Sequence, residues 1–208
     1  MRKILKKPAV VFLIGIFAGI LCRLSDFFPY ESLWSLSSIA TLFGFWIASV
    51  SVITMYSTSH KMSFTNTFLY LFGMTLAFYT LKYLLGFVIP RFANGGRFQT
   101  KLFLVYTGLS LLCGLGSVVL YFWNDRRWYS SVLYAFPAGA LFAEGIACGI
   151  VLMTRHMLLG QTMFDLMTAA WFSIFLGKKA PNKLTFTGAE TAVALIAFFI
   201  IYRNWITF

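Results

Sequence analysis

The chain has 208 residues, of which 60% are hydrophobic and only 11% are charged. Soluble proteins carry roughly 25% charged residues, so this chain lacks the polar side chains that a water-facing surface requires. The composition excludes a soluble enzyme and a disordered chain, and three cysteines without paired spacing exclude a disulfide-stabilised scaffold. We therefore expect an all-α protein embedded in lipid.

The net charge of +11 does not indicate nucleic-acid binding. The 17 Lys and Arg residues, against 6 Asp and Glu, cluster at the ends of apolar runs. Basic residues in that position contact anionic lipid head groups and orient helices in a bilayer. We expect membrane lipids as partners, no nucleic acid, and a multi-pass protein of a bacterial cytoplasmic membrane.

The apolar runs predict a transmembrane helix bundle. A bilayer core about 30 Å thick requires around 20 mostly apolar helical residues. Seven runs approach that length, and six spans is the alternative because the sixth run carries Gln161 and Asp165. Seven spans with a cytoplasmic N-terminus also place more basic residues on the cytoplasmic side than six do. We predict a single integral membrane domain, residues 1–208, with spans at 8–24, 33–56, 65–89, 101–123, 131–153, 158–177 and 188–202.

Small residues spaced four apart line two of these helices. Between membrane helices, small side chains allow the backbones to approach closely and to gain dispersion contacts. We expect both faces to pack inside the bundle, and docking of a partner membrane protein is the alternative. The faces consist of Ala135, Gly139, Ala143 and Ala147, and of Gly15 and Gly19.

Aromatic residues mark several predicted span ends, among them Trp123, Trp128 and Tyr202. Trp and Tyr concentrate where acyl chains meet head groups, because their rings are apolar and their N–H or O–H groups are polar. We expect these three side chains to act as interfacial anchors.

Three ionisable residues fall inside predicted spans: Lys82, Glu144 and Asp165. A charge there costs at least about 2.5 to 3.5 kcal/mol on insertion scales, so it is usually paired or faces a cavity. At about 1.5 Å of rise per residue, all three lie in the same half of the bilayer. We predict an ion-pair cluster that binds a small solute or ion, with Tyr79 and Gln161 as further ligand-binding residues. The alternative is a buried charge network that only fixes the helix positions.

Enzymatic activity is not expected, and we assign no catalytic residue, metal site or cofactor. The two histidines, His60 and His156, fall in a loop and at a helix end, so a Ser or Cys nucleophile has few bases to pair with. The sequence contains no H-E-x-x-H, no P-loop and no Gly-rich nucleotide motif.

The stretch 44–79 contains Gly44 with Trp46, the Tyr56-Ser57 turn, Asn66 at a helix start, Gly73-Met74, and the pair Phe78-Tyr79. Its elements resemble those of uncharacterised bacterial multi-spanning membrane proteins. Size, helix number and the small-residue first helix are also similar to the substrate-binding membrane subunits of energy-coupling-factor importers. The resemblance implies a membrane class and adds no site. The leading expectation is a transport or binding component for a small solute or ion, and the alternative is a non-catalytic partner subunit.

Overall fold

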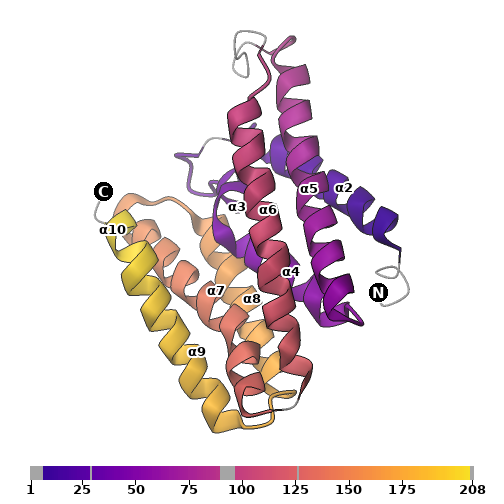
Figure 1. The fold of residues 1–208 in the computed structure, drawn as a ribbon. Coiled ribbons are helices and arrows are strands. Elements are labelled where there is room, and N and C mark those ends of the chain that lie inside the picture. Colours follow the sequence, from indigo (N-terminus) through magenta and orange to yellow (C-terminus); the bar gives the residue numbers. More distant parts are fainter. Residues whose placement is uncertain (1–6, 29, 90–96, 126, 207–208) are drawn as a thin grey trace. The chain divides into compact units, whose positions relative to one another are not determined.

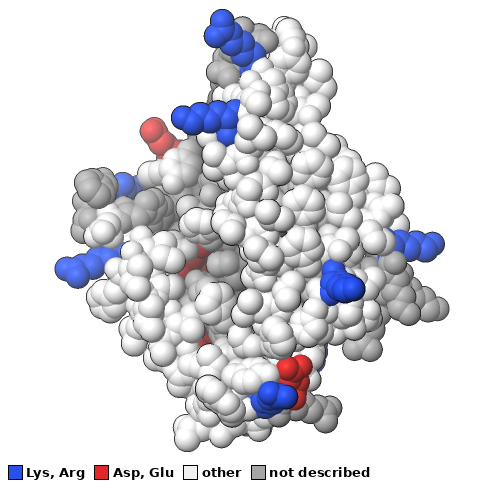
Figure 2. Space-filling view, viewed as in Figure 1, with Lys and Arg blue, Asp and Glu red and all other residues white. Residues whose placement is uncertain are grey.

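A computed structural model describes residues 7–28, 30–89, 97–125 and 127–206. These residues form helices joined by turns and loops, with no strand among them, so the all-α prediction is confirmed. Figure 2 shows a face on which uncharged side chains predominate. Among the described residues, five helices are long and apolar enough to cross a membrane, namely Pro8–Ser25, His60–Leu85, Thr100–Asp125, Trp128–Arg155 and Lys183–Tyr202. They are compatible with an integral membrane protein, with fewer spans than the seven predicted.

The chain divides into two compact units, and each is described by itself; Figure 1 labels most of their helices. The N-terminal unit is Met1–Phe27 with Val52–Tyr121, and the C-terminal unit is Phe28–Ser51 with Phe122–Phe208. The N-terminal unit contains α2 (Pro8–Ser25), α5 (His60–Leu85) and α6 (Thr100–Tyr121). The C-terminal unit contains α3 (Ser38–Thr41), the first part of α4 (Phe43–Tyr56), η2 (Phe122–Asp125), α7 (Trp128–Arg155), α8 (Leu159–Gly177), α9 (Lys183–Ala197), η3 (Phe198–Tyr202) and α10 (Arg203–Ile206).

In the N-terminal unit, α5 packs against both α2 and α6. The contact with α2 depends on glycine: a Cβ at Gly15 would overlap the carbonyl oxygen of Tyr70, and one at Gly19 would overlap that of Met74. Backbones this close gain dispersion contacts that larger residues would prevent. The predicted internal packing of this face is confirmed.

In the C-terminal unit, α7 contacts both α8 and α9 and is the most buried of the five long apolar helices. Its small-residue face lies inside: Ala135, Ala143 and Ala147 have no exposed surface, and Gly139 packs on the carbonyl oxygen of Glu190. Both small-residue faces are therefore covered within the chain and are not open to a partner.

The predicted span at 33–56 is wrong, because helix α4 begins only at Phe43. Leu42 before it is extended, with φ −87° and ψ 167°. Upstream, serine hydroxyls bond locally to the backbone; the Ser38 hydroxyl, for example, donates to the Ser35 carbonyl at 2.7 Å. Such bonds compete with a continuous helix. The remaining 14-residue helix is too short to cross a bilayer core.

The predicted span at 158–177 does form a helix, α8, but α8 is not among the five apolar helices. Gln161 and Asp165 lower its mean hydropathy. The first N–H group of α8 finds its acceptor in the non-helical segment before α4. The Leu159 N–H donates to the Leu33 carbonyl at 2.9 Å. Helix ends need such partners for their free N–H groups.

The other predicted spans match observed helices, with bounds shifted by a few residues. The interfacial anchors are partly wrong. Trp128 is exposed, but Trp123 is buried and stacks on Tyr134 with ring centroids 5.2 Å apart, and Tyr202 is also buried. Tyr202 ends η3, a π-helical segment that continues α9, and π-helical turns are frequent at functional sites.

Candidate functional site

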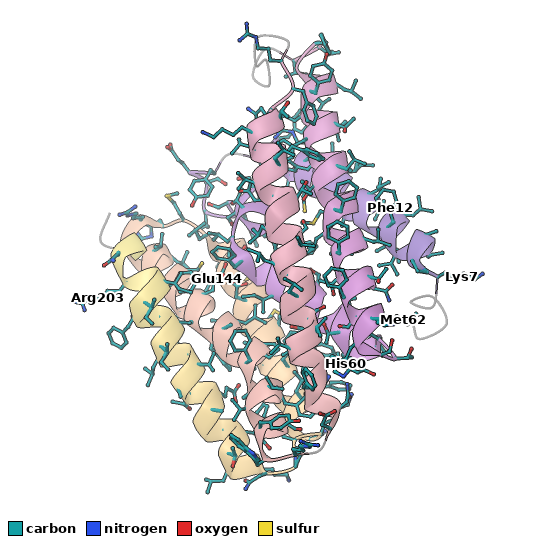
Figure 3. All side chains as sticks on the ribbon, viewed as in Figure 1. Lys7, Phe12, His60, Met62, Glu144 and Arg203 are labelled. Atoms are coloured by element: carbon teal, nitrogen blue, oxygen red, sulfur yellow. The ribbon has the colours of Figure 1, made fainter. Side chains whose placement is uncertain are left out.

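Three polar side chains meet in the interior of the C-terminal unit. Glu144 projects from α7 (Figure 3), Gln161 and Asp165 project from α8, and none of the three has any exposed surface. The arrangement follows from the sequence, since residues four apart share one helical face and α8 packs against α7. The structure thus brings together three of the predicted ligand-binding residues. We call Glu144 and Asp165 the acidic pair.

The Gln161 amide bridges the acidic pair. Its Nε2 lies 2.9 Å from both carboxyl oxygens of Asp165 and 3.4 Å from Oε1 of Glu144. One nitrogen therefore shares two hydrogens among three oxygens. The other end of the same amide, Oε1, is buried and has no hydrogen-bond partner among the described residues. The cluster contains more acceptors than donors.

Glu144 receives further hydrogen bonds from two other elements. The Tyr202 hydroxyl donates to Oε2 at 2.7 Å. The backbone N–H groups of Phe43 and Gly44, the first two residues of α4, also donate to this carboxyl group. Free N–H groups at a helix start favour a negative charge. The late start of α4 therefore places the positive end of a helix at a buried carboxyl group.

Gly44 also packs directly on the rest of the cluster. A Cβ at this position would overlap Oδ1 of Asp165 and would lie 2.9 Å from Nε2 of Gln161. A side chain of any size would displace one of the two. Position 44 therefore requires glycine because α4 begins against the acidic pair.

The described residues of the C-terminal unit supply no counter-charge to the acidic pair. Among the described residues of the C-terminal unit, no basic side chain forms an ion pair with Glu144 or Asp165. In the same part of the chain, no three His, Cys, Asp or Glu side chains are arranged to hold a metal ion. Burying an ion costs several kcal/mol unless a partner compensates it. The arrangement is therefore suited to taking up a positive charge.

Lys82 and Tyr79 belong to the N-terminal unit. The Lys82 ammonium donates to the side-chain oxygen of Gln99 at 2.8 Å, so its partner in that unit is a neutral amide. Tyr79 is buried, with its ring centroid 6.3 Å from that of Phe103 and 6.0 Å from that of Tyr106. Both residues lie among local contacts of their own unit.

Sequence reasoning missed two contributors to the cluster. Tyr202 lies 58 residues from Glu144 and was interpreted as an anchor, and no local pattern pairs it with that carboxyl group. The second is Gly44, which the sequence marks only as one element of a resemblance to other membrane proteins. A glycine at the start of a helix has many structural explanations, so its contact with Asp165 needs the tertiary structure.

The described residues thus form a helical protein with several helices fit to cross a membrane and with a buried acidic pair that has no counter-charge among the described residues of its unit. Comparisons with family models, with curated proteins and with solved structures found no match. Function is therefore inferred from the residues of this chain.

Proposed function

We propose that the chain is an integral protein of a bacterial cytoplasmic membrane that binds protons at its acidic pair and serves in ion transport or ion binding. The observation that carries this proposal is the burial of Glu144 and Asp165 around one nitrogen of Gln161, without a basic partner among the described residues of their unit. A proton removes one of the two charges and thereby most of the cost of burying them together.

The close packing favours a proton over a larger solute or a metal ion. Gly44 contacts Asp165 so tightly that not even a methyl group fits between them. A metal cation requires several oxygen ligands at set distances, whereas a proton requires one. A proton on a carboxyl group also supplies a hydrogen-bond donor, which the cluster lacks because Oε1 of Gln161 is unpartnered within the described chain.

Two general properties favour a functional role over a purely structural one. An apolar pair of similar volume would hold two helices together as well as a buried ionic group or better. Ionisable residues inside membrane helices are expensive and commonly mark ion pathways. The start of the short helix α4 at Glu144 fits the same interpretation, because interrupted helices of transporters direct their N-termini at the binding site.

The proposal is tested by proton flux into vesicles. The purified protein would be reconstituted in liposomes that contain a pH-sensitive dye, and an inside-negative electrical potential would then be imposed to draw protons into the lumen. We expect wild-type vesicles to acidify, and Asp165→Asn vesicles to behave like protein-free ones. Glu190→Gln is the matched control, because it removes a carboxylate from α9 of the same unit and should leave the flux unchanged. Wild-type flux equal to that of protein-free vesicles contradicts ion transport.

A further inference from the structure

We infer that Asp165 is the carboxyl group that takes up and releases the proton, while Glu144 remains ionised as its fixed neighbour. This inference rests on the proposed function and assigns unequal roles to the two members of the acidic pair. It follows from how the hydrogen-bond donors are divided between them.

Glu144 is supplied with donors from several elements. Tyr202 of η3 donates its hydroxyl at 2.7 Å, and Phe43 and Gly44 of α4 donate two backbone N–H groups. Nε2 of Gln161 lies at the longer distance of 3.4 Å. Hydrogen bonds to an ionised carboxyl group stabilise that form, and the start of a helix adds a favourable dipole. The surroundings of Glu144 therefore suit a permanent negative charge.

Asp165 has far less support. Among the described residues, its hydrogen-bond donor is Nε2 of Gln161, which lies 2.9 Å from both oxygens and must serve Glu144 as well. Gly44 packs against Oδ1 so closely that a Cβ at this position would overlap it. A second buried negative charge here would face that of Glu144 across a single amide group.

The titratable groups around Asp165 do not relieve this charge. Glu144 and Cys148 face it from α7, and Tyr202 faces it from η3; all three are neutral or negative. Among the described residues of the C-terminal unit, no basic side chain pairs with it. A proton taken from water by an Asp165 oxygen cancels the repulsion, and its return to water restores it. This reversible change is what an ion pathway requires.

Infrared spectroscopy of the protein in lipid distinguishes the two carboxyl groups. We expect the wild type at neutral pH to show the C=O band of a protonated carboxyl group. The band should be absent from Asp165→Asn and present in Glu144→Gln. In Glu144→Gln it should disappear at a lower pH than in the wild type, because the neighbouring negative charge is gone. Glu190→Gln should leave the band unchanged.

The outcomes separate this inference from the proposed function. A band that survives Asp165→Asn and is lost in Glu144→Gln reverses the two roles but leaves proton binding intact. A wild type without any such band contradicts both. If Asp165→Asn loses its helical circular dichroism, the variant is misfolded and cannot be used. The infrared spectrum of wild-type protein labelled with ¹³C-glutamate is then measured instead. The band then keeps its frequency if it belongs to Asp165, and it shifts if it belongs to Glu144.

Discussion

The two units bury ionisable groups in opposite ways. In the N-terminal unit, Arg23 forms an ion pair with Asp26, and its guanidinium lies 5.2 Å from the ring centroid of Phe78. In the C-terminal unit, Glu144 and Asp165 are buried beside each other without a cation among the described residues of that unit. A buried charge that is paired with an opposite charge, such as Arg23 with Asp26, can serve a purely structural role. A buried acidic pair without one needs a further positive charge, and this difference directs the functional assignment to the C-terminal unit.

Buried polarity by itself does not make that distinction. The N-terminal unit also buries hydroxyl groups: Ser63 donates to the carbonyl of Ser117 at 3.2 Å, and Ser117 donates to the carbonyl of Gly114 at 2.7 Å. These neutral donors find acceptors on neighbouring backbone, so burying them costs little. The signal for function is therefore ionisable groups that lack compensation, and the following variants are designed to break or sharpen this contrast.

The largest effect on stability is expected from Gly19→Leu in the N-terminal unit. A side chain at this position must displace the backbone of Met74, and overpacking of this kind costs about 3 kcal/mol. Unfolding in mixed micelles would measure the loss. Gly116→Leu is the control, because a Cβ there meets no atom within 4 Å. Equal destabilisation by both variants would contradict the glycine-mediated contact of α2 with α5.

Gly44→Ala is expected to cost about 2 kcal/mol, because the added methyl group overlaps Oδ1 of Asp165. Unlike Gly19→Leu, it should also abolish the proton flux, since it displaces the acidic pair itself. Gly188→Ala provides the matched control in open space, and there the helix propensity of alanine should raise stability slightly. A fully active Gly44→Ala protein would show that α4 does not set the geometry of the acidic pair.

A smaller loss, about 1 kcal/mol, is expected for Tyr202→Phe, because it removes one donor from a buried carboxyl group. Tyr129→Phe deletes a comparable hydroxyl that donates to Asp125 at 2.8 Å in an exposed position, so its effect should be close to zero. The free energies of unfolding of the two variants give the comparison. Indistinguishable free energies of unfolding would contradict a stabilising hydrogen bond from Tyr202 to Glu144.

The smallest effect is expected for Lys82→Gln, which replaces a cation that donates to the neutral side chain of Gln99. Stability should change by no more than about 0.5 kcal/mol, and proton flux should stay at the wild-type level. The vesicle assay and the unfolding assay together check this. Loss of flux as complete as in Asp165→Asn would mean that the ionisable groups of the two units act together.

Local patterns predicted much of the fold, because hydropathy over some 20 residues reports directly on a helix such as α2 or α7. The spacing of Gln161 and Asp165 also predicted that they share a face. The prediction of a span at 33–56 was wrong because mean hydropathy does not report the hydrogen bonds that serine side chains such as Ser38 form with nearby backbone. The partners of Glu144 could not be predicted, since Tyr202 and the N–H groups of α4 reach it only through tertiary packing.

The most direct test compares the carboxyl groups of the two units in unmodified protein. The chain has three aspartates, Asp26, Asp125 and Asp165. In protein labelled with ¹³C-aspartate and held in lipid at neutral pH, the carboxyl resonances measured by NMR report which of them carries a proton. We expect Asp165 to be protonated while Asp26, paired with Arg23, is ionised. Three ionised aspartates would contradict it.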